Sequence, residues 1–358
     1  MKILYIMSSY NLYGGTPKKT LDLMKHFKEN SILYVYNDTF PELKSKFEET
    51  GGRVYEGFYG QNVFLHLKKL LLIIDNENIN LVQTQFSMGE TLGFLIKLFR
   101  PKVKLIIAFV GSLQPSNLKS FLVSQLYRKA DFFIYISAFV KAEKIKQFPI
   151  LKKKNSKIIY NGTEKRIDDG EPILEMKSFN ILDIAGLTKI KNIEVLIEAL
   201  NIIVNELKIN DIFLYVAGDG PQKPFLKELI NSYKLQNHVF LLGYQTNVGR
   251  FIDKCNLFVH PCYVEGFGIA VAEAMHAAKP IIVSNAGALP ELIEDGKTGL
   301  IVDPFSPVEW AEAILLLKDN KALASKLCLN ARKHAQNHFN IDSYCKNYED
   351  LYVKLLKR

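Results

Sequence analysis

The chain has 358 residues, of which 48% are hydrophobic and 23% are charged, and its net charge is +9. This length suffices for two domains of ordinary size, and the composition excludes extensive disorder. No uninterrupted apolar run approaches the roughly 20 residues of a transmembrane helix, and the opening segment lacks the apolar core and the cleavage site of a signal peptide. We therefore expect a globular, cytoplasmic protein.

The positive charge is concentrated in the first half of the chain. Residues 1–170 carry 26 basic and 15 acidic side chains, whereas the remainder carry 20 and 22. Residues 141–157 hold seven lysines and one glutamate around an apolar Phe-Pro-Ile-Leu string. This pattern favours contact with the anionic inner face of the cell membrane or a lipid-phosphate acceptor, and the alternative is an ordinary solvated surface. No nucleic-acid-binding motif accompanies the charge, so we expect no nucleic-acid partner.

Short apolar segments alternate with helical patterns through the first half of the chain. The expected strands are residues 3–7, 32–36, 81–84, 105–109, 132–136 and 157–160. The expected helices include residues 17–27, 62–74 and 87–99. This alternation predicts a doubly wound parallel sheet.

The loop after the first strand contains Gly14 and Gly15 and leads into a helix. A strand, a glycine-rich loop and a helix in this order are typical of a ligand-binding entry in an open parallel sheet, and a plain tight turn is the alternative. The third glycine of a dinucleotide fingerprint is absent, so a nicotinamide cofactor is not expected.

A second alternating set of elements follows a polar segment. Residues 164–177 are rich in Asp, Glu and Lys and are expected to form a linker. The strands expected beyond it are residues 179–185, 213–217, 239–242, 257–260, 281–284 and 300–302. Helices are expected over residues 308–335 and 340–357. The second half is therefore predicted to be another Rossmann-like domain.

A glycine-rich loop precedes the helix that we predict over residues 269–278. Its sequence is Glu265-Gly266-Phe267-Gly268. A helix start offers unpaired backbone N–H groups and the positive end of the helix dipole to an anion, and glycine lets a phosphate approach the main chain closely. The loop is therefore a candidate phosphate site, and the alternative is an ordinary strand-to-helix turn.

Three further features fit a sugar nucleotide. Glu265 and Glu273 are eight positions apart, which is roughly 12 Å along a helix axis and close to the span from the sugar to the ribose. Lys191 lies near the start of another predicted helix, where its ammonium and the helix dipole can both meet a phosphate. A second glycine-containing helix start, at residues 287–291, gives the pair of anion-binding turns that suits a diphosphate.

The string from Glu265 to Glu273, with the Gly-Ala-Leu-Pro-Glu turn at residues 287–291, resembles the donor site of family 4 retaining glycosyltransferases, which belong to the glycosyl transferases group 1. The resemblance covers nearly the whole chain and is strong from about residue 179 to residue 304. It implies the α/β GT-B fold, in which two Rossmann-like domains with parallel sheets face each other across a cleft. It also implies a nucleotide-diphosphate sugar as the donor, and we prefer a uridine diphosphate sugar over guanosine diphosphate mannose.

The resemblance assigns roles to individual residues. Glu265 is expected to contact the transferred sugar and Glu273 to hold the ribose hydroxyls. Lys191 is expected to meet the diphosphate and to act with Glu265 in catalysis. The remaining donor-binding positions are Gly15, Gly266, Phe267, Gly268 and Ile269.

Three places depart from the family pattern, and one of them is Gln83-Thr84-Gln85, which stands where histidine-containing strings are frequent. Gly186 stands where the family commonly has an arginine, and Val110 stands where it often has a histidine near the reacting sugar. His260 does not replace that histidine, since it lies at a strand end of the second half, where a structural hydrogen-bonding role is equally open to it. The missing arginine removes one cation from the diphosphate, which costs about a few kcal/mol of leaving-group stabilisation unless another group replaces it.

No pattern typical of a metal site occurs in the sequence. Asp-x-Asp is absent, and no two of the four cysteines have the spacing of a zinc or redox motif. We expect free thiols, no cofactor and no metal ion. Helix dipoles, backbone amides and Lys191 would then stabilise the diphosphate.

The sequence therefore predicts a metal-independent retaining glycosyltransferase that moves a hexose to a saccharide or lipid-linked acceptor of the cell envelope. Because Gly186 and Val110 replace polar family residues, a non-catalytic sugar-nucleotide-binding or chaperone subunit remains an alternative, as does a nucleotide-sugar 2-epimerase. The expected parts are an acceptor-side domain, a linker, a donor domain and a C-terminal helix that crosses back to the first domain, at residues 1–163, 164–177, 178–339 and 340–358.

Overall fold

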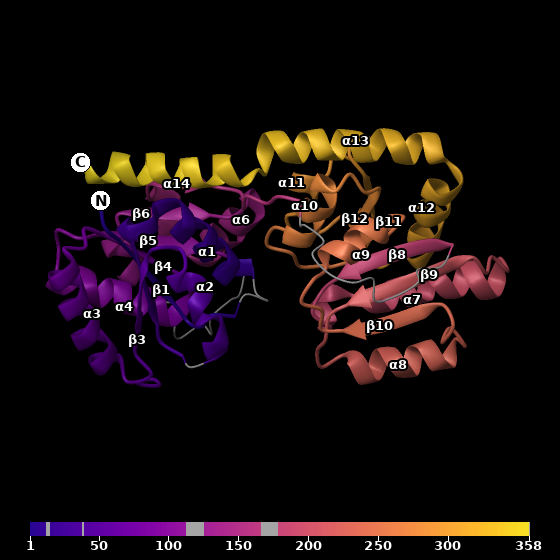
Figure 1. Cartoon of the computed structure of the whole chain (residues 1–358). Coiled ribbons are helices and arrows are strands. Elements are labelled where there is room, and N and C mark those ends of the chain that lie inside the picture. The colour runs from indigo at the N-terminus through magenta and orange to yellow at the C-terminus, as the bar shows by residue number, and fades with distance from the viewer. Residues whose placement is uncertain (12–14, 38, 112–124, 166–177, 358) are drawn as a thin grey trace. The chain divides into compact units, whose positions relative to one another are not determined.

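The computed structural model describes residues 1–11, 15–37, 39–111, 125–165 and 178–357. The chain divides into two compact units (Figure 1). The first unit comprises Met1–Gly162 together with Ile341–Arg358, and the second comprises Thr163–Asn340. Most of the predicted linker, residues 166–177, lies outside the described residues.

The first unit is built on a seven-stranded parallel sheet with the strand order β3-β2-β1-β4-β5-β6-β7. Every residue of β1, β2 and β4 is buried, as expected for strands that are covered by helices on both faces. Ile3 pairs with Ser31 on one side and with Leu81 on the other, so the strand order reverses at β1. The strands are β1 (Ile3–Met7), β2 (Ser31–Val35), β3 (Arg53–Glu56), β4 (Leu81–Thr84), β5 (Lys104–Phe109), β6 (Phe132–Tyr135) and β7 (Ser156–Ile158).

Helices follow most of these strands, and polar side chains fix where two of them begin. The Asn62 and Ser137 side chains accept hydrogen bonds from the backbone N–H groups of Leu65 and Val140, each at 3.1 Å, and so cap α3 and α6. The described helices of this unit are α1 (Gly15–Phe27), α2 (Lys44–Glu48), α3 (Val63–Glu77), α4 (Phe86–Phe99), α6 (Ala138–Gln147) and α14 (Ile341–Leu356).

Helix α14 belongs to the first unit although it follows the whole second unit in the sequence. Its buried face includes Tyr344, Tyr348 and Tyr352, which join the core formed by β1, β2 and α1. The Tyr352 hydroxyl donates a hydrogen bond to Gln83 Oε1 on β4 at 2.6 Å. The core of the first unit is therefore completed by the last helix of the chain.

The second unit contains a six-stranded parallel sheet with the order β10-β9-β8-β11-β12-β13. Strand β8 lies between β9 and β11, so the strand order reverses at β8. In open α/β sheets, ligands bind beyond the carboxyl ends of the strands at such a reversal. The strands are β8 (Phe179–Ile184), β9 (Ile212–Ala217), β10 (Val239–Gly243), β11 (Leu257–His260), β12 (Ile281–Ser284) and β13 (Leu300–Val302).

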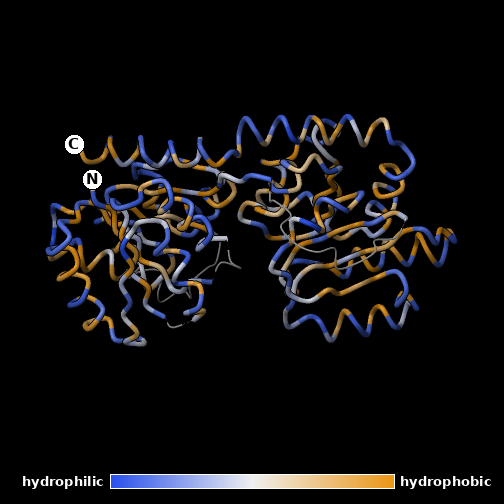
Figure 2. The backbone as a smooth tube through the Cα atoms, viewed as in Figure 1, coloured by the Kyte–Doolittle hydropathy of each residue, from blue (hydrophilic) through white to orange (hydrophobic). Residues whose placement is uncertain are grey.

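The helices of the second unit cover an apolar core. Figure 2 shows that hydrophobic residues are concentrated along the strands, whereas hydrophobic and hydrophilic residues alternate along the helices. Trp310, the only tryptophan in the sequence, is fully buried there, and its indole N–H donates to the Asp303 carbonyl at 3.1 Å. The helices are α7 (Ile193–Asn201), its π-helical extension (Ile202–Glu206), α8 (Lys223–Ser232), α9 (Gly249–Lys254), α10 (Ile269–His276), α11 (Leu289–Leu292), α12 (Pro307–Asp319) and α13 (Lys321–His338).

The predicted fold class of two Rossmann-like domains with parallel sheets is confirmed. The prediction of one helix over residues 308–335 is wrong, because α12 ends at Asp319 and the Asn320 side chain caps α13 by accepting from the Leu323 N–H at 2.9 Å. Strand β3 was not predicted. Within the described residues, every helix is too short or too polar to cross a lipid bilayer.

Candidate active site

The candidate site lies at the carboxyl ends of β8 and β11, where the strand order reverses. Lys191 ends a 3-10 turn (Lys189–Lys191) that follows β8. His260 is the last residue of β11, and Glu265 lies in the loop between β11 and α10. Because β8 and β11 are neighbouring parallel strands, the two loops begin at the same edge of the sheet.

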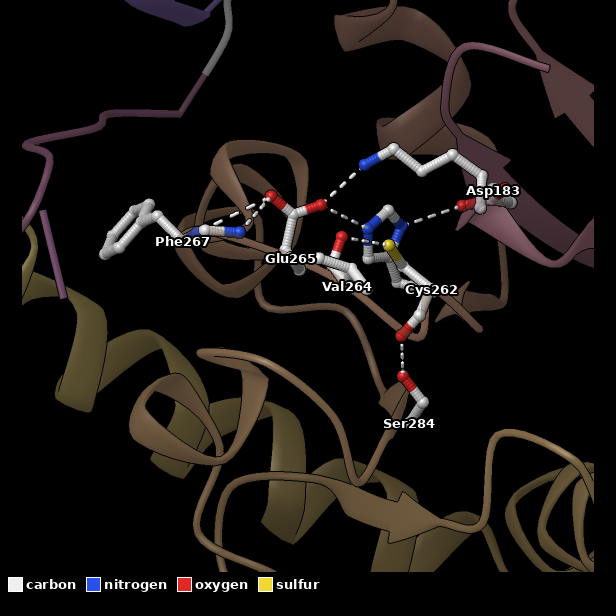
Figure 3. A network of polar contacts seen from close by, with 9 residues as sticks. Asp183, Cys262, Val264, Glu265, Phe267 and Ser284 are labelled. Atoms are coloured by element: carbon white, nitrogen blue, oxygen red, sulfur yellow. Dashed lines mark hydrogen bonds and ion pairs between the residues drawn. The ribbon is translucent and has the colours of Figure 1, made fainter. Parts of the chain in front are cut away.

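The Glu265 carboxylate accepts hydrogen bonds on both of its oxygens. Its Oε2 lies 2.5 Å from Lys191 Nζ and 3.2 Å from His260 Nε2. Its Oε1 accepts from the backbone N–H groups of Gly266 at 3.1 Å and Phe267 at 3.5 Å (Figure 3). The Glu265 and Lys191 side chains remain 17% and 21% exposed, so both are accessible to a ligand.

A buried aspartate supports this arrangement from β8. Asp183 Oδ1 lies 3.0 Å from His260 Nδ1, and Figure 3 shows Asp183 on the side of the imidazole away from Glu265. Asp183 is fully buried and His260 is 2% exposed. Sequence reasoning missed Asp183, and the available signal was an acidic residue within a largely apolar strand.

The charges in the site reinforce one another. Burial alone would raise the pKa of Glu265, but the hydrogen bond from His260 and the charges of Lys191 and His260 outweigh burial and hold that pKa well below its usual range. Burial alone would lower the pKa of Lys191, and the nearby Glu265 carboxylate raises it instead. Both groups are therefore charged at neutral pH, and they form an ion pair.

Helix α10 presents an uncapped N-terminus beside this pair. Gly268 precedes the helix with φ +99°, a conformation that favours glycine, and no side chain caps the first turn. The first amides of an α-helix have no acceptor within the helix, so those at Ile269 and the next residues can donate to an anion. An ammonium, a carboxylate and an anion-binding helix start thus lie on two adjacent loops of one unit.

A second glycine turn supports the Glu265 loop from behind. The Ala288 N–H donates to the Glu265 carbonyl at 2.9 Å. A Cβ on Gly287, whose φ is +58°, would lie 2.4 Å from that same carbonyl oxygen. The loop that carries Glu265 therefore requires a glycine at position 287.

Other predicted site residues differ in their surroundings. Glu273 lies on α10 and is only 2% exposed. Its predicted contact with ribose stays a prediction. The Phe267 ring is 2% exposed and packs edge-on against Phe339, with ring centroids 5.6 Å apart, which leaves its backbone as the part open to a donor. Gly15 is the exposed first residue of α1 in the first unit.

Gly186 and Val110, which depart from the family pattern, differ in their structural setting. Gly186 follows β8 and is exposed, and a Cβ there would meet only the Asp219 carbonyl, at 3.8 Å. Position 186 therefore has space for a side chain, but it lacks the positive charge of the arginine that the family commonly has there. Val110 follows β5 and is half-buried, and residues 112–124 beyond it lie outside the described residues.

One group of side chains in the described part of the chain has the composition of a metal site. Ligand atoms of His260, Cys262 and Glu265 lie within 4.8 Å of one another. However, both His260 nitrogens face carboxylates, and the Cys262 thiol donates to the Val264 carbonyl at 2.9 Å (Figure 3). Each of these ligand atoms already has a hydrogen-bond partner within the protein. The absence of a metal stays a prediction.

Comparison with known proteins shows similarity to glycosyltransferases. Residues 164–335 match the family described as glycosyl transferases group 1. The N-acetyl-alpha-D-glucosaminyl L-malate synthase of Bacillus anthracis is 24% identical over 100% of this chain and 98% of its own. Nearly the whole second unit is therefore similar to the group 1 glycosyltransferases.

Two further similarities concern part of the chain and the fold. The O-antigen biosynthesis glycosyltransferase WclY of Escherichia coli is 31% identical to this chain over 57% of each chain. The solved structure of Anabaena Alr3699/HepE in complex with UDP matches 99% of this chain and 100% of its own, with a TM-score of 0.84 and 20% identity. That structural similarity confirms the predicted GT-B fold.

Proposed function

We propose that this protein is a group 1 glycosyltransferase, namely a retaining, family 4-like hexosyltransferase. It moves a sugar from a nucleotide-diphosphate sugar to a saccharide or lipid-linked acceptor of the cell envelope. The observation that carries the proposal is the Lys191–Glu265 pair beside the uncapped N-terminus of α10. This set offers positive charge to a diphosphate and a carboxylate to sugar hydroxyls.

Each group has a defined part in the proposed reaction. Lys191 and the backbone amides of Gly268 and Ile269 stabilise the charge that develops on the departing diphosphate, while the amides of Gly266 and Phe267 hold Glu265. Glu265 orients the sugar, and Glu273 holds the ribose. The bond between the anomeric carbon and the phosphate oxygen breaks, the acceptor oxygen bonds to the same face of that carbon, and the acceptor proton passes to a diphosphate oxygen.

The same groups supply the charge stabilisation that a metal ion provides in other glycosyltransferases. A helix N-terminus carries roughly half an elementary positive charge, and an ammonium adds a full one. We therefore propose metal-independent transfer. Transfer that persists in EDTA supports this part of the proposal, and transfer that EDTA abolishes contradicts it.

A uridine diphosphate sugar is the donor that we propose. The structural similarity to Alr3699/HepE, which was solved in complex with UDP, supports this preference.

The acceptor proposal rests on charge and on one relative. Exposed lysines follow one another along α6 and the turn after it, at Lys146, Lys152 and Lys153. The WclY relative is named for O-antigen biosynthesis. We propose a cytoplasmic enzyme with peripheral contact to anionic membrane. Sedimentation with anionic vesicles at low salt, lost at about 1 M salt, supports that contact, and equal sedimentation with neutral vesicles contradicts it.

The deciding experiment combines binding and turnover. Nucleotides and sugar nucleotides are screened by thermal shift, since a ligand at 100 times its dissociation constant stabilises a protein by about 2.7 kcal/mol. The ligand that binds is then tested for transfer with the wild-type protein, Glu265→Gln and the surface control Glu312→Gln. We expect Glu265→Gln to bind the donor but to lose about 100-fold or more in turnover, and the control to be unaffected.

A non-catalytic subunit is the second candidate, and the uncharged position 186 favours it. It predicts that the wild-type protein binds a sugar nucleotide and transfers nothing to any acceptor. Conversion of the nucleotide sugar without an acceptor would instead indicate a 2-epimerase.

A further inference from the structure

His260 lies between two carboxylates in the second unit. Its Nδ1 is 3.0 Å from Asp183 Oδ1, and its Nε2 is 3.2 Å from Glu265 Oε2. A neutral imidazole has one N–H donor and one lone pair, so it satisfies only one of two carboxylates. The geometry therefore favours N–H groups on both nitrogens, which makes the ring a cation.

Charged and titratable groups face His260 from three elements. Asp183 belongs to β8, Lys191 to the 3-10 turn after it, and Cys262 and Glu265 to the loop after β11. With His260 protonated, two cations balance two anions. With His260 neutral, the fully buried Asp183 carboxylate would lose its cationic partner, which is strongly unfavourable in a protein interior.

Lys191 is the partner that is free to move within this network. Its side chain is 21% exposed, whereas His260 is 2% exposed. A donor diphosphate competes with the Glu265 carboxylate for Lys191 because it carries more negative charge. Once Lys191 has turned to the diphosphate, Glu265 keeps its two backbone amides and His260.

Resting on the proposed function, we propose that the Asp183–His260 pair positions Glu265 for sugar transfer. The pair keeps the carboxylate ionised and aimed at the sugar after Lys191 has moved to the diphosphate. His260 acts as a positioning residue, since its burial keeps it from the donor itself. Protonated His260 thereby supplies a second cation, in addition to Lys191, to a site that has glycine at position 186.

The ionisation of His260 is consistent with this role. Burial alone would lower the pKa of His260, but its hydrogen bonds with Asp183, Cys262 and Glu265 outweigh burial and raise that pKa well above 6.5. Transfer is therefore expected to persist through neutral pH and to fall in the alkaline range, when His260 loses its proton.

The first test measures transfer as a function of pH in full-length variants. Asp183→Asn keeps the shape of the side chain and removes its charge, so the alkaline fall in kcat should move toward pH 6.5. His260→Gln should lower kcat by about 100-fold with donor KM changed less than about threefold, and its alkaline fall should disappear. Asp211→Asn, an exposed aspartate of the same unit, is the matched control and should behave as wild type.

The second test reads the charge of His260 directly and needs no substrate. Imidazole resonances are followed by NMR during a pH titration, with the His260 signal assigned from the spectrum of His260→Gln or, if that variant does not fold, of Asp183→Asn. We expect His260 in the wild-type protein to stay protonated well above pH 6.5 and to titrate earlier in Asp183→Asn. A His260 that is already neutral at pH 6.5 overturns the inference.

The outcomes separate the two proposals. Absence of transfer by the wild-type protein with every donor overturns the proposed function, and this inference with it. Normal transfer by the wild-type protein, combined with an unchanged pH profile in Asp183→Asn, overturns the inference and leaves the proposed function standing.

Discussion

At the scale of single residues, the Glu265 carboxylate organises the site. It accepts from Lys191, His260 and two backbone amides, so it is held in one orientation before any donor arrives. Preorganised charge of this kind costs no rearrangement during the reaction. Removing Lys191 and removing Glu265 itself should therefore have different effects, the first on donor binding and the second on stability.

Replacing Lys191 by alanine should weaken donor binding. The variant removes a charged contact to the diphosphate, and Glu265 keeps His260 and its two amides. We expect an increase of about 10- to 100-fold in the dissociation constant of the nucleotide diphosphate, measured by isothermal titration calorimetry. Lys189→Ala, in the same turn but exposed, is the matched control. Equal affinities for the two variants would contradict the role of Lys191.

Replacing Glu265 by glutamine should destabilise the second unit in a pH-dependent way. At pH 7 the change leaves Lys191 without its anionic partner and His260 with Asp183 alone, and we expect a loss of about 2 kcal/mol in the free energy of unfolding. The pKa of Glu265 is depressed in the folded state, so its contribution is present above about pH 4.5 and declines as the pH falls toward the folded pKa. Urea unfolding followed by Trp310 fluorescence at pH 7 and pH 4 measures the difference, which should be smaller at pH 4. A difference that is larger at acidic pH would contradict this assignment.

At the scale of elements, the sequence predicted most strands and several helix starts but not how distant loops meet. Apolar segments such as β8 and β11 are recognisable because both faces of a central parallel strand are buried. Strand β3, Arg53–Glu56, was missed because it is polar and at most half-buried at the sheet edge.

The contact between Lys191 and Glu265 was not predictable from the sequence, because it depends on the order of the strands in the sheet. The two residues are 74 positions apart, and they meet because β8 pairs with β11 rather than with β10. Strand order of this kind arises from packing across the whole sheet. The Asp183–His260 pair was missed for the same reason, whereas the glycine turn and the Glu265–Glu273 spacing are local and were visible.

Replacing Gly287 by alanine tests the turn that supports Glu265. The new Cβ would lie 2.4 Å from the Glu265 carbonyl oxygen, and the residue has φ +58°. Gly296→Ala is the matched control, since Gly296 has φ +66° but no atom within 4 Å of an added Cβ. We expect Gly287→Ala to lose about 1–3 kcal/mol more than the control, measured by urea unfolding with Trp310 fluorescence. Equal losses would show that backbone strain alone matters at position 287.

At the scale of the whole molecule, each unit has its own sheet and core, and α14 belongs to the first. Deleting residues 341–358 should therefore expose the first-unit core around Tyr344, Tyr348 and Tyr352 and leave the second unit intact. Hydrogen–deuterium exchange should increase in β1 and α1, while the urea transition of Trp310 stays unchanged. Loss of the Trp310 transition would contradict this independence.

A milder change provides the control for that deletion. Tyr352→Phe removes only the hydroxyl, which bonds to Gln83 and Tyr5, and retains the ring, so we expect a cost of about 1 kcal/mol in the first unit.

The position of α14 also sets an order for synthesis on the ribosome. Residues 1–162 are made first, yet their core lacks a helix that is encoded after all of the second unit. During translation the second unit can close on itself while the first still exposes the apolar surface reserved for α14. The unit that is made first is therefore the one that is finished last, and nascent chains stalled before residue 341 should need a chaperone.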